Sequence, residues 1–124
     1  MGDSVLYQAW YDRASTDLAG ANILYEHGGA YELVAFHCQQ AIEKQLKGWI
    51  LKESGELMEG HNLPFLRRHA ISLGAPLQSY GNDMGFVNQF YIETRYPADE
   101  YIAVSEEEAQ DCLDVAKAIL AVLK

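Results

Sequence analysis

The sequence predicts an all-α protein, an up-and-down four-helix bundle with an additional short helix, in a single domain over residues 1–124. Apolar residues recur at steps of three and four along most of the chain, which is the spacing of one helix face. Glycines and prolines interrupt this pattern between the segments, and the whole chain contains only three prolines. A helix-capping motif precedes the last apolar segment.

Two long helices are expected first, from Ser4 to His27 and from Ala30 to Ser54. In each of them mainly apolar residues fall on one face at 100° per residue. These are Tyr7, Trp10, Ala14, Leu18, Ala21, Leu24 and Tyr25 on the first helix, and Val34, Cys38, Ala41, Ile42, Gln45 and Trp49 on the second. Gly28-Gly29 between them suits the left-handed conformation that ends a helix, so the two should pack antiparallel as a hairpin.

Two helices are expected in the middle of the chain. Asn62 is a suitable N-cap for a short helix over residues 63–72. A fourth helix is expected over residues 77–94, and it should end there because the residue before Pro97 avoids helical geometry.

The last helix has the clearest start. Ser105 and Glu108 have the spacing of a capping box, and acids in the first turn suit the positive end of the helix dipole. Its apolar stripe consists of Ala109, Cys112, Leu113, Ala116, Ile119, Leu120 and Leu123.

The net charge of −9 argues against broad binding to a nucleic acid backbone. Basic residues are nevertheless concentrated in the middle of the chain, which is compatible with a local cationic site. They are Lys44, Lys47, Lys52, Arg67 and Arg68. No run approaches the ~18 apolar residues that a membrane span needs, and no signal peptide pattern occurs at the N-terminus. A cytoplasmic protein without a membrane segment is expected.

The sequence lacks the motifs of several common catalytic and metal-binding sites. There is no glycine-rich phosphate loop, no CxxC, no HExxH and no Glu-x-x-His pair, so neither a metal nor a cofactor is expected. No serine or cysteine lies in a nucleophile elbow. Cys38 and Cys112 are expected to be buried free thiols, because both fall among apolar neighbours.

Asp17 lies on the apolar face of the first helix and therefore needs a hydrogen-bond donor. It is either an acid that orients a cation of a binding site or one half of a structural ion pair. We expect it to lie within reach of Arg95, His37 or Lys44.

A polar stripe on the second helix contains His37, Gln40, Lys44 and Lys47. These side chains suit the binding of a phosphate and the hydrogen bonding of a base. The alternative is a solvated helix face with His37 partly buried.

Arg95 and Tyr96 follow the fourth predicted helix. An arginine beside an aromatic ring suits contact with a phosphate or a base. The alternative is that Arg95 pairs with the acidic segment that follows it. His61 is expected to organise the loop before the third helix.

These residues also resemble a known family. The segment from Ala35 to Lys47, AFHCQQAIEKQLK, resembles the core helix signature of HEPN domains. The segments 60–63 (GHNL) and 95–97 (RYP) are similar to that family's His-Asp/Asn-Leu loop and its RYP element. Residues 14–18 are similar to its first helix, including the acid. The match covers nearly the whole chain in the family's order.

The resemblance implies a helical bundle that dimerises and associates with nucleotides or RNA, often beside a minimal nucleotidyltransferase in toxin–antitoxin pairs. Many HEPN proteins are metal-independent endoribonucleases with an Arg-x4–6-His motif. Carried over here, the arginine is Arg95, and the positions for the histidine hold Glu100, Tyr101 and Ile102. The usual group for proton transfer is therefore missing, and nuclease activity is not expected.

The sequence thus predicts a homodimeric, nucleotide- or RNA-associated module without its own catalysis, a companion of a minimal nucleotidyltransferase. Its expected binding residues are Arg95, Tyr96, His37, Gln40, Lys44 and Lys47, with Asp17 as the orienting acid. Two alternatives remain open. One is a divergent metal-independent endoribonuclease, and the other is an assembly partner that binds no ligand.

Overall fold

The computed structural model describes residues 2–91 and 103–124, with side chains from residue 6 onward. Every regular element in these ranges is helical, which confirms the predicted fold class. In chain order they are α1 (Gly2–Glu26), α2 (Tyr31–Ser54), α3 (Leu63–Ser72), the 3-10 helix η1 (Gln78–Tyr80), α4 (Gly81–Asn88) and α5 (Glu106–Val122). None of the helices in the described ranges is long and apolar enough to cross a membrane.

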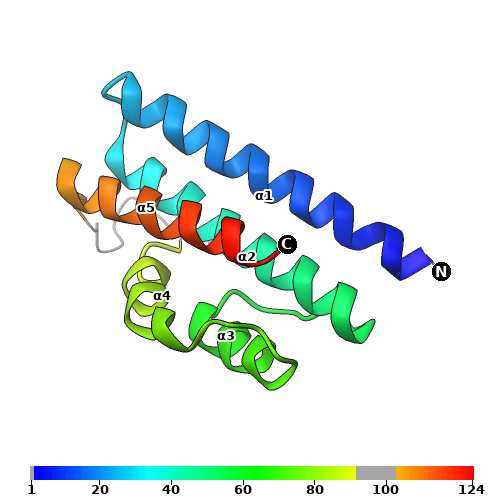
Figure 1. Cartoon of the computed structure of the whole chain (residues 1–124). Coiled ribbons are helices and arrows are strands. Elements are labelled where there is room, and N and C mark those ends of the chain that lie inside the picture. Colours follow the sequence, from blue (N-terminus) through cyan, green and yellow to red (C-terminus); the bar gives the residue numbers. More distant parts are fainter. Residues whose placement is uncertain (1, 92–102) are drawn as a thin grey trace.

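Helix α2 lies at the centre of the molecule. Helices α1 and α5 pack along one side of it, and α3 and α4 lie on the other (Figure 1). Between Ala41 and Leu51 every residue of α2 is buried except Lys44. This stretch includes the polar residues Glu43, Gln45 and Lys47, so each of them needs a partner inside the protein.

The predicted hairpin of α1 and α2 is confirmed, and it depends on glycine at two places. Gly28 in the turn has φ +65°, a conformation that other residues rarely adopt. Gly48 on α2 lies directly against α1, where a Cβ atom would come within 2.8 Å of the Tyr11 ring and 3.0 Å of the Trp10 Cβ. The Tyr11 hydroxyl is buried and has no hydrogen-bond partner in the described part of the chain.

Both predicted caps are present. The Asn62 side chain accepts the Phe65 N–H at 2.9 Å and so begins α3. At the start of α5 the Ser105 hydroxyl accepts the Glu108 N–H at 3.1 Å, and the Glu108 carboxylate accepts the Ser105 N–H at 3.0 Å. The predicted capping box is therefore complete.

The predicted fourth helix over residues 77–94 is wrong in its extent. The structure has the short η1 and then α4, which ends at Asn88. The N–H groups of Phe90 and Tyr91 bond to carbonyls only three residues back, so the helix closes in a tight turn. The Asn88 side chain accepts the Leu63 N–H at 2.9 Å, and Phe90 turns into the core. Residues 92–94 lie outside the described residues.

Both cysteines are buried and free, as predicted. Burial raises the pKa of the Cys38 thiol, and burial together with the nearby acids Asp111 and Glu108 raises the pKa of Cys112 to about 12. Both thiols therefore keep their protons at neutral pH and pack as small apolar side chains.

The contact at Gly48 predicts opposite effects for the same substitution on the two helices. Alanine is the better helix former by roughly 0.5–1 kcal/mol. Gly48→Ala should nevertheless lower the free energy of unfolding by about 1–2 kcal/mol, because the added methyl group overpacks the contact with Trp10 and Tyr11. Gly20→Ala on α1 is the matched control, since nothing lies within 4 Å of its Cβ position, and it should stabilise the protein. Urea unfolding of both variants tests this, and a Gly48→Ala variant as stable as Gly20→Ala would contradict it.

Candidate functional site

Asp17 joins α1 to two basic side chains of α2. Its Oδ1 lies 3.1 Å from His37 Nδ1, and its Oδ2 accepts a hydrogen bond from Lys44 Nζ at 2.6 Å. His37 and Lys44 are seven residues apart, two helical turns, and so lie on the same side of α2. The prediction that Asp17 has a cationic partner among these residues is confirmed.

The cluster of Asp17, His37 and Lys44 is partly open to solvent. The side chains of His37 and Lys44 are 35% and 23% exposed, whereas that of Asp17 is 15% exposed. The carboxylate holds His37 at Nδ1, and the other ring nitrogen, Nε2, has no hydrogen-bond partner in the described part of the chain. The acid therefore orients an imidazole whose second nitrogen remains able to donate or accept.

Glu43 is the centre of a second polar cluster, which is more deeply buried. Its carboxylate lies 3.0 Å from Lys47 Nζ and 3.1 Å from His61 Nδ1. The amide groups of Gln39 and Gln40 each approach it to 3.4 Å. The side chains of Glu43 and Lys47 are only 4% and 8% exposed, so this is a buried ion pair with additional donors.

The second cluster also organises the loop before α3. The Gln39 amide donates to the His61 carbonyl at 3.1 Å, while the His61 ring bonds to Glu43. On its other side the His61 ring stacks on Tyr91, with ring centroids 4.3 Å apart and planes 15° from parallel. These contacts bind the end of α4 and the start of α3 to α2, which agrees with the role expected for His61.

The predicted polar stripe on α2 is thus divided between two clusters. His37 and Lys44 share Asp17, whereas Gln40 and Lys47 belong to the cluster around Glu43. Lys47 is buried, and its ammonium lies 5.8 Å from the centre of the Trp10 ring. It is therefore not an exposed cation, and its ammonium is already paired with Glu43.

The remaining predicted residues are Arg95 and Tyr96, which lie outside the described residues. The positions compared with the family's histidine, Glu100, Tyr101 and Ile102, lie there as well. Within residues 2–91 and 103–124 no group of three or more acidic, histidine or cysteine side chains could hold a metal ion.

Sequence reasoning missed Glu43 and Gln39 as site residues. The available indication was the spacing of Glu43 and Lys47, four residues apart, which places an acid and a base on adjacent turns of a helix. That spacing is common on solvated helix faces, so it did not reveal that the pair is buried.

Comparison with known proteins identifies the relatives of this fold. A model of the HEPN domain family matches residues 7–124. The chain is similar to TT1696 from Thermus thermophilus, with a TM-score of 0.77, 28% identity and 94% of each chain covered. It is also similar to ST0689, described as an archaeal HEPN homologue, with a TM-score of 0.71 and 29% identity over 93% of this chain and 92% of that one. No curated protein matched the sequence.

Replacement of Glu43 by glutamine tests the buried cluster. Glu43→Gln keeps the shape of the side chain but leaves the Lys47 ammonium buried without an acid. We expect a loss of about 2–4 kcal/mol in the free energy of unfolding, measured in urea at neutral pH. The double variant Glu43→Gln/Lys47→Met should recover part of this loss, because it removes the unpaired charge as well.

The control for this experiment is Glu53→Gln. Glu53 lies 3.8 Å from Lys52 in an exposed pair, so its loss should change the stability by less than about 0.5 kcal/mol. A Glu43→Gln variant as stable as Glu53→Gln would show that the buried pair contributes little.

Proposed function

This chain belongs to the HEPN domain family, and on that premise we propose that it is a dimeric module that binds a nucleotide or RNA and has no catalysis of its own. The main support for the proposal is the Asp17 carboxylate, which binds both His37 and Lys44 on a partly exposed surface. In this proposal Asp17 is the orienting acid, and the two basic side chains contact the ligand.

The ligand would contact this surface through hydrogen bonds and through one cation, the Lys44 ammonium. The Lys44 ammonium can donate to a phosphate oxygen while it remains bonded to Asp17, because it carries three N–H groups. The Nε2 atom of His37 and the amide of Gln40 suit the edge of a base or a ribose hydroxyl. Lys47 would act indirectly, by holding Glu43 and through it Gln40. Arg95 and Tyr96 are proposed to complete the site with a phosphate contact and a stacking surface.

We further propose that the module forms a homodimer and accompanies a minimal nucleotidyltransferase in the cytoplasm, as part of a toxin–antitoxin-like pair. The family supports this proposal, since HEPN domains are often dimeric.

A second candidate function is a divergent metal-independent endoribonuclease. The contact of His37 with Asp17 favours it, because a carboxylate that holds Nδ1 of a histidine sets the tautomer that general acid–base catalysis requires. Against it stands the absence of histidine at positions 100, 101 and 102. A pure assembly partner without a ligand is the third candidate.

The first test is a thermal-shift measurement with ATP, GTP and a short single-stranded RNA, each at millimolar concentration, together with a mass measurement in solution. We expect at least one ligand to raise the Tm by about 2 °C or more, because a ligand that binds only the folded state stabilises it. The mass should be twice that of the chain. The shift should be lost in His37→Gln and Lys44→Gln.

The matched control is Arg68→Gln on the exposed surface of α3, which should keep the full shift. Unshifted melting with all three ligands would favour the assembly partner. An equal shift in Tm for the Lys44→Gln and native proteins would show that the cluster of Asp17, His37 and Lys44 does not bind the ligand.

A separate prediction concerns catalysis. Purified protein incubated with RNA in the presence of EDTA should leave the RNA intact, because the expected histidine is missing. If the native protein cleaves RNA, and both His37→Gln and Arg95→Ala lose the cleavage at unchanged Tm, the protein is an endoribonuclease and the proposed non-catalytic function is wrong.

A further inference from the structure

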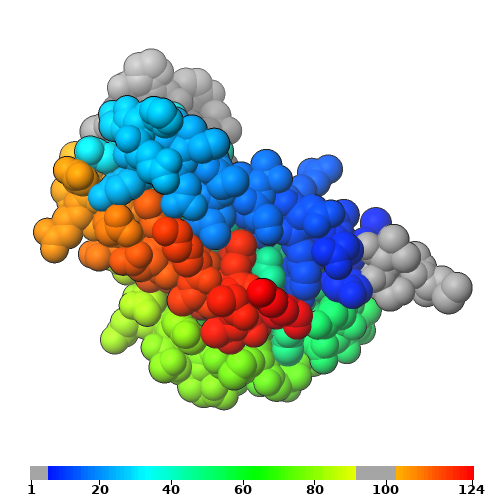
Figure 2. Space-filling view, turned by 45° about the horizontal axis from the view of Figure 1, so that its top comes forward, coloured from blue at the N-terminus to red at the C-terminus, as the bar shows by residue number. Residues whose placement is uncertain are grey.

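A groove lies between α1 and the C-terminal half of α5, on the side of α1 that faces away from the Asp17 cluster. Figure 2 shows α2 at the bottom of the space between α1 (blue) and the end of α5 (red). The groove has a volume of about 610 Å³ and is open to solvent. None of the residues of the two polar clusters lines it.

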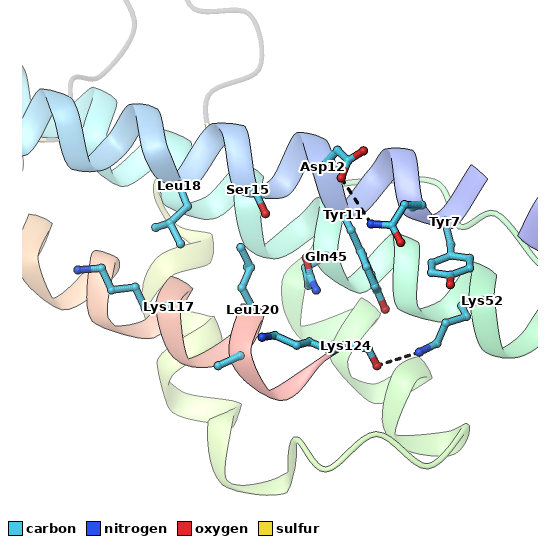
Figure 3. Close-up of a pocket in the computed structure, with 12 residues that line it drawn as sticks. Tyr7, Tyr11, Asp12, Ser15, Leu18, Gln45, Lys52, Lys117, Leu120 and Lys124 are labelled. Atoms are coloured by element: carbon cyan, nitrogen blue, oxygen red, sulfur yellow. Dashed lines mark hydrogen bonds between the residues drawn. The ribbon is translucent and has the colours of Figure 1, made fainter. Parts of the chain in front are cut away.

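The walls of the groove are largely apolar. Leu18 from α1 faces Leu120 from α5, and the Tyr7 and Tyr11 rings extend the α1 wall (Figure 3). The two tyrosine rings meet edge to face, with centroids 5.4 Å apart and planes at 77°. Such walls suit an apolar chain or a flat ring.

The charge of the groove is opposite to that of the whole chain. Three lysines line it, Lys52, Lys117 and Lys124, against one acid, Asp12, whose carboxylate accepts the Gln8 amide at 3.4 Å. The chain has a net charge of −9 and only nine Lys and Arg residues in all, so a third of them line this groove. This concentration favours an anionic ligand.

Two of these lysines are available to a ligand. Lys52 already has an acidic partner, Glu53 at 3.8 Å, and it donates to the Lys124 carbonyl at 2.8 Å and lies 5.8 Å from the centre of the Tyr7 ring, so it has a defined position. The side-chain ammonium groups of Lys117 and Lys124 have no acidic side-chain partner within residues 6–91 and 103–124. A bound anion would give Lys124 an acidic partner.

From these observations we propose that the groove binds a small amphipathic anion, a carboxylate or phosphate carried on an apolar chain or a flat ring. The anionic group would pair with the ammonium group of Lys124, while Lys117, seven residues earlier in the chain, would add to the positive charge of the groove. The apolar body would lie against Leu18, Leu120 and the tyrosines. The volume is within the roughly 300–1,000 Å³ usual for small-molecule sites. Three lysines are too few for a long nucleic acid backbone, which favours a small ligand.

The probe for this site is the dye 8-anilinonaphthalene-1-sulfonate, which joins an anion to flat rings. Titration of the native, folded protein should show one saturable site per chain by fluorescence. Lys117→Gln/Lys124→Gln should weaken the binding about fivefold or more at unchanged Tm, because the charge-assisted contact with Lys124 and the positive charge of Lys117 are both lost. Arg13→Gln, which neutralises a cation beside Leu6 and Trp10 on the other face of α1, is the matched control and should bind as the native protein does.

Displacement of the dye then identifies the kind of anion. Release by decanoate and not by AMP assigns a carboxylate on an apolar chain, and the reverse assigns a phosphate on a nucleoside. Release by both supports the shared chemistry. The proposal is overturned by dye binding that does not saturate, by equal affinity in the double variant and the control, or by failure of both competitors at millimolar concentration. Lys44 does not line the groove, so Lys44→Gln should leave the dye affinity unchanged. The dye therefore tests the groove alone, and the thermal-shift measurement tests the site around Asp17 on α2.

Discussion

The close packing of α1 on α2 at Gly48 brings the two longest helices into contact and makes α2 the centre of the fold. With no side chain at this position, the two helices approach until Trp10 and Tyr11 touch the α2 backbone region around Gly48. Helices α3, α4 and α5 contact α2 as well, so α2 is enclosed over most of its length. Every polar side chain in that stretch must then be paired inside the protein, because a buried unpaired group is costly.

The two polar clusters satisfy this requirement in different ways. Around Glu43 the acid, the lysine and the amides are almost completely enclosed, and the histidine stacks on Tyr91, so this cluster holds α2, α3 and α4 together. Around Asp17 the acid is mostly buried, but its two basic partners reach the surface. The two clusters therefore have different roles. The buried cluster around Glu43 holds α2 in place, and the partly exposed cluster around Asp17 presents an oriented imidazole and an ammonium group to solvent.

Helix α1 gives the protein two unlike surfaces. On one side Asp17 is joined to the basic residues of α2, and on the other the tyrosines and Leu18 form a wall of the groove against α5. The apolar positions of α1 therefore serve both the hairpin with α2 and this groove. The two surfaces share no residue among those that line the groove or form the clusters, and a ligand at one would not exclude a ligand at the other.

Features that depend on residues close together in the chain could be predicted from the sequence alone. The caps at Asn62 and Ser105 and the glycine turn after α1 follow from local geometry, and all three were predicted correctly. The apolar stripes were predicted correctly only in part, because Tyr7, Leu18 and Leu120 are partly buried and line the groove. The position of Asp17 on an apolar face also required a nearby cation. Only the tertiary structure decided that Lys47 is buried against Glu43 and that α4 ends at Asn88. The burial of Lys47 depends on the helices that enclose α2, and the end of α4 depends on the bond of Asn88 to the Leu63 N–H and on the burial of Phe90. The periodicity of a single helix contains no information about these contacts with residues distant in sequence.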